Sequence, residues 1–79
     1  MSSLKSEFDS CFELLLNKLN SLTGSVLMNA LGDNPQKKDH DRLNKYWMAL
    51  QIEIADEIRS MTCFQNSLNS RWHKILMNI

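Results

Sequence analysis

The chain has 79 residues, with nine basic and nine acidic side chains, so its formal net charge at pH 7 is +0. A hydrophobic fraction of 43% is ordinary for a globular domain and argues against disorder. The chain lacks the basic surplus that binding to a phosphate backbone requires, so nucleic acid is not an expected partner. This length predicts one small domain over residues 1–79.

The apolar runs are too short for membrane insertion. None approaches the roughly 20 residues that a spanning helix needs, so we expect no membrane span. Asp9 and Glu13 interrupt the place where a secretory signal would carry its apolar region. The sequence therefore predicts a protein that stays in the cytoplasm or is exported without a cleaved signal peptide.

The first segment has the apolar spacing of a helix. Steps of three and four residues keep one stripe on a single helix face. Its positions are Leu4, Phe8, Phe12, Leu15, Leu19, Leu22, Val26 and Ala30. The pattern predicts a helix over about residues 3–31, with Gly24 as its weak point because glycine lowers helical propensity.

A bend is expected over residues 32–38, because Gly32 and Pro35 are typical of a helix end and a new helix start. Asp39, His40 and Asp41 follow within this region and carry groups that can bind metal. Consecutive residues on a helix point about 100° apart and do not converge on one ion. We therefore expect no metal site here.

The second segment continues the helical pattern. Its apolar positions are Leu43, Trp47, Leu50, Ile54, Ile58, Met61, Phe64, Leu68, Trp72, Ile75 and Ile79. Ten steps span 36 residues, a mean of 3.6, which is the repeat of an α-helix. This predicts a long helix over about residues 39–78. Alternatively, the polar residues near 62–70 break it and leave a third short helix.

These elements predict an all-α fold, an antiparallel helical hairpin in which the second helix outruns the first. The surplus end is apolar and should not remain in water. Either it folds back as a third helix, or another chain buries it. The side chains expected at such an interface are Phe64, Leu68, Trp72, Ile75, Leu76 and Ile79.

The sequence contains no recognisable catalytic motif. It has no glycine-rich phosphate loop and no hydrolase or metalloprotease motif, so we expect no enzyme, no cofactor and no small-molecule substrate. His40 and His73 stand beside no obvious nucleophile. Cys11 and Cys63 lie in no metal-binding spacing and are expected to be free thiols.

Short words in the sequence resemble a known family. They are "ALGDNP" at 30–35, "LNKY" at 43–46, "IRSM" at 58–61 and the apolar ending "HKILMNI". Together they resemble the needle subunits of bacterial type III secretion systems. The resemblance implies a helix–turn–helix subunit that is exported without a cleaved signal, with its C-terminal helix buried between copies in a filament. The sequence departs from that family pattern in three features: its two cysteines, its two tryptophans and the stretch "TCFQNSLNS" at 62–70.

The sequence thus predicts a non-enzymatic assembly module, a needle-like subunit that associates with itself through its C-terminal helix. The small helical chaperones of the same protein-transport system are the second candidate. In that alternative the chain is a cytosolic chaperone, adaptor or regulator that binds another helical protein.

Overall fold

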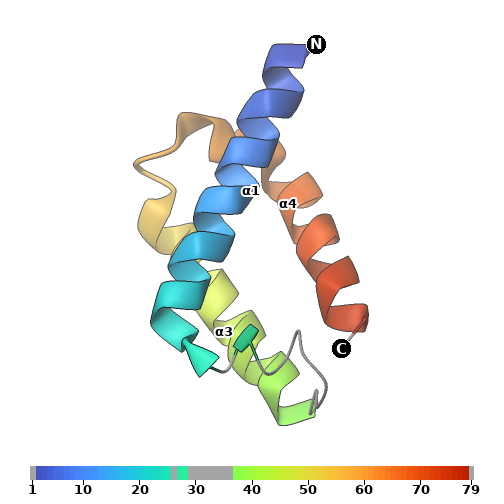
Figure 1. The fold of residues 1–79 in the computed structure, drawn as a ribbon. Helices are drawn as coiled ribbons and strands as arrows, with labels where there is room; N and C mark the ends of the chain where they lie inside the picture. Colours follow the sequence, from blue (N-terminus) through green and yellow to red (C-terminus); the bar gives the residue numbers. More distant parts are fainter. Residues whose placement is uncertain (1, 26, 29–36, 79) are drawn as a thin grey trace.

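The computed structural model describes residues 2–25, 27–28 and 37–78. Its principal helices are α1 (Ser2–Thr23), α3 (Lys37–Ile54) and α4 (Arg59–Met77). The described residues contain no strand, so the all-α prediction is confirmed. α1 lies across α3 and α4 and packs on both of them (Figure 1).

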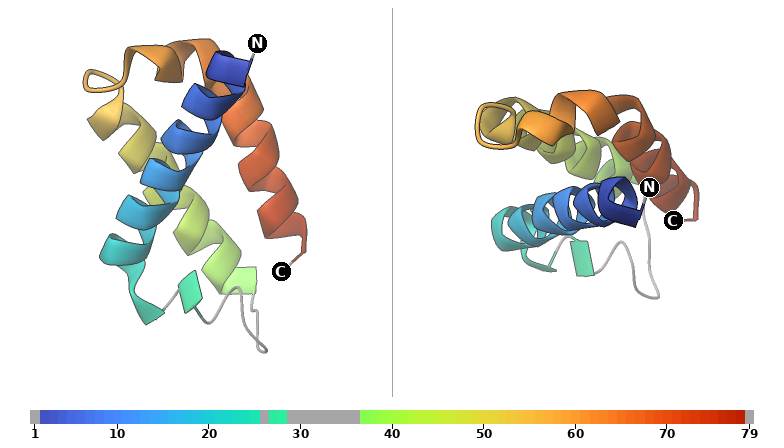
Figure 2. Two further views of the ribbon diagram at one scale, coloured as in Figure 1. Left: turned by 45° about the horizontal axis from the view of Figure 1, so that its top comes forward. Right: turned by 90° about the horizontal axis from the view of Figure 1, so that it is seen from above.

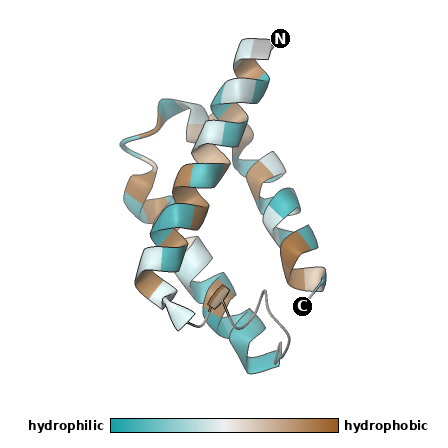
Figure 3. Ribbon diagram, in the orientation of Figure 1, coloured by the Kyte–Doolittle hydropathy of each residue, from teal (hydrophilic) through white to brown (hydrophobic). Residues whose placement is uncertain are grey.

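The helices form two layers. Seen from above, α1 makes one layer, and α3 and α4 lie side by side in the other (Figure 2). The α3 ribbon changes from hydrophilic at its start to more hydrophobic near its end (Figure 3). The core between the layers is built from apolar side chains of these three helices together with Leu27, which follows α1. Its members are Cys11, Phe12, Leu15, Leu19, Leu27, Leu43, Trp47, Leu50, Ile54, Met61, Leu68, Trp72 and Leu76.

The first helix was predicted to run to residue 31, but α1 ends at Thr23. Gly24 follows with a φ of 54°, a left-handed conformation that favours glycine. The weak point seen in the sequence is thus the end of α1. The predicted end at 31 and residues 32–36 of the predicted bend lie outside the described residues, while residues 37 and 38 already belong to α3.

The prediction of one long helix over residues 39–78 is wrong. The chain reverses at residues 55–58, between α3 and α4. The alternative break near 62–70 is also misplaced, because that stretch lies inside α4. Its low helical propensity is outweighed by tertiary packing, since Leu68 is fully buried and the Asn69 side chain bonds to α3.

The apolar end of the chain folds back on the rest of the molecule. This was one of the two alternatives left open by the sequence, although the third helix starts at Arg59 and is longer than expected. Phe64 packs its ring edge-to-face on Phe8, with centroids 5.4 Å apart. α1 therefore covers α4 as well as α3, and the predicted two-helix hairpin is replaced by three helices.

Candidate interaction surface

Two tryptophans join α3 to α4. The Trp47 and Trp72 rings stack with centroids 4.7 Å apart and an interplanar angle of 7°. The indole N–H of Trp47 donates to Asn69 Oδ1 at 2.9 Å, and that of Trp72 donates to Asn44 Oδ1 at 3.2 Å. α3 therefore contributes Trp47 and Asn44 to this contact, and α4 contributes Trp72 and Asn69. We call these four residues the tryptophan clasp.

The clasp comes from a short repeat that the sequence analysis missed. Leu43-Asn44-x-x-Trp47 in α3 recurs as Leu68-Asn69-x-x-Trp72 in α4. Both leucines are fully buried in the core. The repeated "LNxxW" was readable in the sequence, and it was the signal that α3 and α4 pair with each other. The two copies bond reciprocally, so the pair has a local two-fold character.

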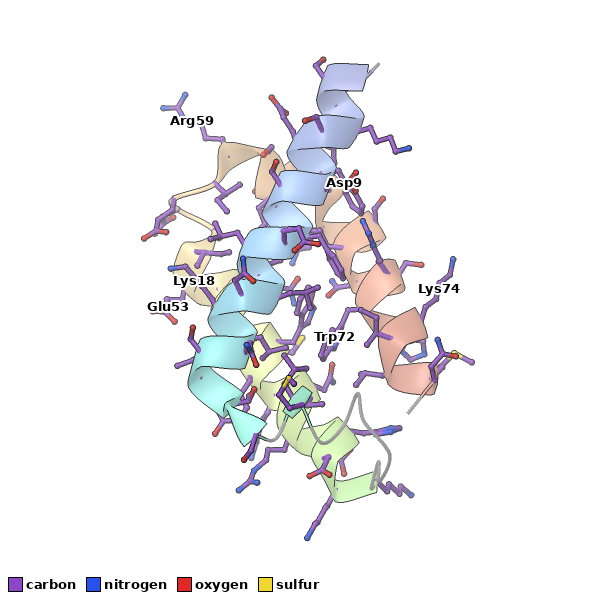
Figure 4. All side chains as sticks on the ribbon, in the orientation of Figure 1. Asp9, Lys18, Glu53, Arg59, Trp72 and Lys74 are labelled. Carbon is purple, nitrogen blue, oxygen red and sulfur yellow. The ribbon has the colours of Figure 1, made fainter. Side chains whose placement is uncertain are left out.

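The structure describes five of the six residues predicted as an interface. Leu68, Trp72 and Leu76 are buried in the core of the chain itself. Phe64 and Ile75 are partly buried against that core, and Ile79 lies outside the described residues. Figure 4 shows Trp72 pointing from α4 toward the other helices. The closed chain does not present these side chains as one exposed face.

Arg71 on α4 contacts two side chains of α1. Its guanidinium bonds Asp9 Oδ1 at 2.9 Å and lies over the Phe12 ring, 4.4 Å from the centroid. Both charged side chains are about half exposed, so the ion pair itself contributes at most about 1 kcal/mol. The stacking on Phe12 adds a contribution of about 0.5–1 kcal/mol. In Figure 4, Asp9 extends from α1 on the side of α4.

The two cysteines are free thiols in different surroundings. Cys11 is buried, whereas Cys63 is exposed on α4. Burial raises the pKa of the Cys11 thiol, because the thiolate loses hydration there. At neutral pH this thiol therefore stays protonated and is a poor nucleophile.

The outer face of α3 carries exposed apolar side chains. Met48 is 54% exposed and Ile52 is 78% exposed. They lie four residues apart, so they are neighbours on the helix surface. Lys45 precedes Met48 by three residues in α3, and Asp56 follows Ile52 by four residues in the turn after α3; both are exposed. We call these four residues the α3 stripe.

Beneath the α3 stripe lies a polar side chain. Gln51 is 4% exposed, and its amide nitrogen lies 3.9 Å from the Met48 sulfur. Its Oε1 has no hydrogen-bond partner among the described residues. A buried amide oxygen without a partner costs stability, so Gln51 is a weak point of the packing under this face.

Charge is distributed unevenly along α3. Its first half has more basic than acidic side chains: Lys37, Lys38, Arg42 and Lys45 against Asp39 and Asp41. The charged side chains at or just past its end are all acidic: Glu53, Asp56 and Glu57. This order opposes the helix dipole, which favours acidic side chains at the start and basic ones at the end. α3 thus offers a positive and a negative end to a partner.

No family model matches the chain. The search of curated proteins and the search of solved structures likewise find no match.

The described residues give no second kind of site. Asp39, His40 and Asp41 lie in consecutive positions of α3, and no three metal-binding side chains converge anywhere in residues 2–25, 27–28 and 37–78. Over the same residues, none of the helices has the length and hydropathy needed to cross a bilayer. Leu4, Leu22 and Met77 are also exposed, but Met48 and Ile52 are the pair that lies one turn apart on α3.

Proposed function

We propose that the chain is a non-enzymatic helical protein–protein interaction module that docks a partner helix on the α3 stripe. The observation that supports this is the exposure of Met48 and Ile52 at adjacent turns of one helix, between a basic and an acidic residue. A partner protein that covers both side chains removes apolar area from water.

The spacing and charges of the stripe define the partner. Helix recognition uses apolar anchors at i and i+4, the spacing of Met48 and Ile52. A fitting helix carries an apolar stripe of its own, with an acidic residue opposite Lys45 and a basic residue opposite Asp56. The reversed pairing places like charges together, so the charge order selects the direction in which the partner helix binds.

The resemblance to type III secretion proteins offers two roles for such a module. The burial of Leu68 and Trp72 within one chain favours the cytosolic chaperone or adaptor. The needle-like subunit instead needs these side chains to be buried between copies, which requires α4 to leave its place on α1. In either role the chain works in the cytoplasm or is exported without a cleaved signal peptide.

Site-specific cross-linking tests the docking surface. A photoreactive amino acid replaces Met48, and in a separate protein it replaces Lys74, which is exposed on α4. Irradiation in the cell that encodes the chain should give a discrete product from position 48 and none from position 74. Equal products from both positions would contradict the proposal.

The identified partner is then titrated against matched variants. Ile52→Lys should weaken binding at least tenfold, because it places a charge in an apolar contact, while Ile52→Leu should bind nearly as the parent does. Ile52 is largely exposed, so both variants should keep the parent's unfolding free energy within about 0.5 kcal/mol. Unchanged affinity in Ile52→Lys would remove the stripe from the interface.

A further inference from the structure

Only four residues, 55–58, separate α3 from α4. The backbone N–H groups of Glu57 and Ile58 both donate to the Ile54 carbonyl, at 3.0 and 3.1 Å, so residues 55–57 form a tight turn directly after α3. Ile58 itself is extended, with φ −119° and ψ 101°. Met61 N–H then donates to the Ile58 carbonyl at 3.2 Å as α4 begins. Joining the two helices therefore requires a change of backbone conformation only within this short turn and at the extended Ile58.

The local sequence at the break contains no typical helix-breaking residue. Residues 55–58 read "ADEI" and contain neither glycine nor proline. Ile58 caps α4 without a side-chain hydrogen bond, although isoleucine is among the poorest N-cap residues. Each of these features is typical of a helix interior.

Charged residues flank the break on both sides, at the end of α3 and at the start of α4. Arg59 begins α4, and Glu53, Asp56 and Glu57 surround the end of α3. Arg59 at the start of α4 and Glu53 at the end of α3 have the sign that the dipole of their helix end disfavours, whereas Asp56 and Glu57 also lie just before the N-terminus of α4, whose dipole favours acidic side chains. Joining α3 to α4 removes both ends and with them the penalty at Arg59 and Glu53. Local physics therefore favours one continuous helix, and tertiary packing holds the break.

The apolar pattern also runs through the break. Ile54, Ile58 and Met61 follow one another at steps of four and three. Trp47 and Trp72 lie 25 residues apart, which is about seven turns of 3.6 residues. Joined as one helix, α3 and α4 would present both halves of the tryptophan clasp on the same face. That face needs a second helix to cover it.

We propose that this chain exchanges α4 with a second copy of itself. In the exchanged dimer, residues 37–77 form one helix, and two such helices lie antiparallel with their symmetry axis close to Ile58. Trp47 of each copy stacks on Trp72 of the other, and both pairs of tryptophan–asparagine bonds form between copies. This arrangement uses the buried faces of α3 and α4, not the α3 stripe, and so goes beyond the proposed docking function.

A second copy is the occupant that fits because it supplies the contacts between α3 and α4 that opening breaks. The clasp is already reciprocal between α3 and α4, which run in opposite directions in the closed chain. An antiparallel dimer keeps that relation and no longer needs the reversal at Ile58. The Asp9–Arg71 pair, 2.9 Å apart in the closed chain, can likewise form between copies.

Arg59 provides a matched pair of variants. Arg59→Pro suits the closed chain, since proline is favoured at the first residue of a helix and prefers an extended residue before it, as Ile58 is. The same proline lies in the interior of the continuous helix and disrupts it. Arg59→Ala removes the same charge and leaves the helix free to join. In Figure 4, Arg59 points away from the helices.

The experiment refolds each protein from denaturant at high and at low concentration and measures mass by light scattering after gel filtration. The parent and Arg59→Ala should yield a dimer at high concentration that persists after hundredfold dilution, because its separation requires unfolding. Arg59→Pro should lower the dimer association constant at least about a hundredfold and remain a folded monomer by circular dichroism.

Three results would overturn the exchange. They are a parent that stays monomeric at every refolding concentration, a dimer that dissociates at once on dilution, and a dimer that Arg59→Pro forms as readily as the parent. The last two indicate association through a surface such as the α3 stripe. Ile52→Lys then separates the proposals, because it should disrupt docking on the stripe and leave the exchanged dimer intact.

Discussion

α1 and α3 end in opposite ways. At the end of α1, Gly24 adopts a φ of 54° and its N–H donates to the Asn20 carbonyl at 2.7 Å. The Thr23 hydroxyl donates to the Leu19 carbonyl at 2.8 Å, so both residues of this end have local bonds. After the end of α3 at Ile54, the chain turns back at Ile58, which has neither a positive φ nor a capping side chain.

The difference separates two sources of structure. The end at Gly24 is encoded by the residue that occupies it, since glycine adopts the left-handed conformation at little cost. The end at Ile58 is imposed from outside, by the tryptophan clasp and by α1. Cys11, Leu14 and Ile58 line one surface hollow, so α1 lies against the break. Changes to distant contacts should therefore affect the second end and leave the first intact.

The largest effect is expected from Trp72→Ala. This side chain is 2% exposed and stacks on Trp47, so its removal should cost about 3–5 kcal/mol of unfolding free energy. Urea unfolding followed by far-ultraviolet circular dichroism measures the change. Trp72→Phe is the control, because it keeps an aromatic ring and loses the bond to exposed Asn44, which should cost about 1 kcal/mol. Equal losses in the two variants would show that ring packing does not hold the break.

A smaller effect is expected at the locally encoded end. Gly24→Ala should cost about 1–2 kcal/mol, because an alanine at this φ is strained. An added Cβ meets no atom within 4 Å, so the loss comes from the backbone alone. Ser25→Ala, at the next exposed position, should change stability by less than about 0.5 kcal/mol. A neutral Gly24→Ala would mean that this end, too, is set by distant packing.

The smallest effect concerns the thiol beside the break. Burial raises the pKa of Cys11 in the folded chain above its ordinary value of 9.0. The unfolding free energy should therefore be insensitive to this group below pH 9.0 and should fall above it, as the thiol ionises first in the unfolded chain. Urea unfolding across this pH range measures the fall, which Cys11→Ala should remove. A fall of equal size in Cys11→Ala would assign it to other groups.

Much of the fold was readable from apolar spacing. The stripe from Leu4 to Ala30 predicted a helix that α1 covers as far as Thr23, and the later stripe predicted helix throughout the range that α3 and α4 occupy, although as one long helix. Gly24 was recognised as a weak point because its residue type carries the information. The reversal at Ile58 was not predictable in this way, since residues 55–58 favour a helix and the apolar pattern continues through them. Only long-range contacts distinguish the bent chain from the straight one.

The candidate surface was harder to predict for the same reason. The apolar character of Leu68, Trp72 and Leu76 was recognised, and it does mark side chains that are covered. Their cover is α1 and α3 of the same chain, which follows from a reversal that the sequence did not reveal. Met48 and Ile52 lie on a face that periodicity alone assigns to solvent, and their exposure at adjacent turns became apparent only in the structure.

The tryptophan clasp also gives the molecule an optical property. The chain has two tryptophans, and both belong to the stacked pair. Intrinsic indole fluorescence and the near-ultraviolet circular dichroism of coupled indoles therefore report on the contact between α3 and α4 without an added label. Opening and re-pairing of these helices can be followed in real time with the unmodified protein.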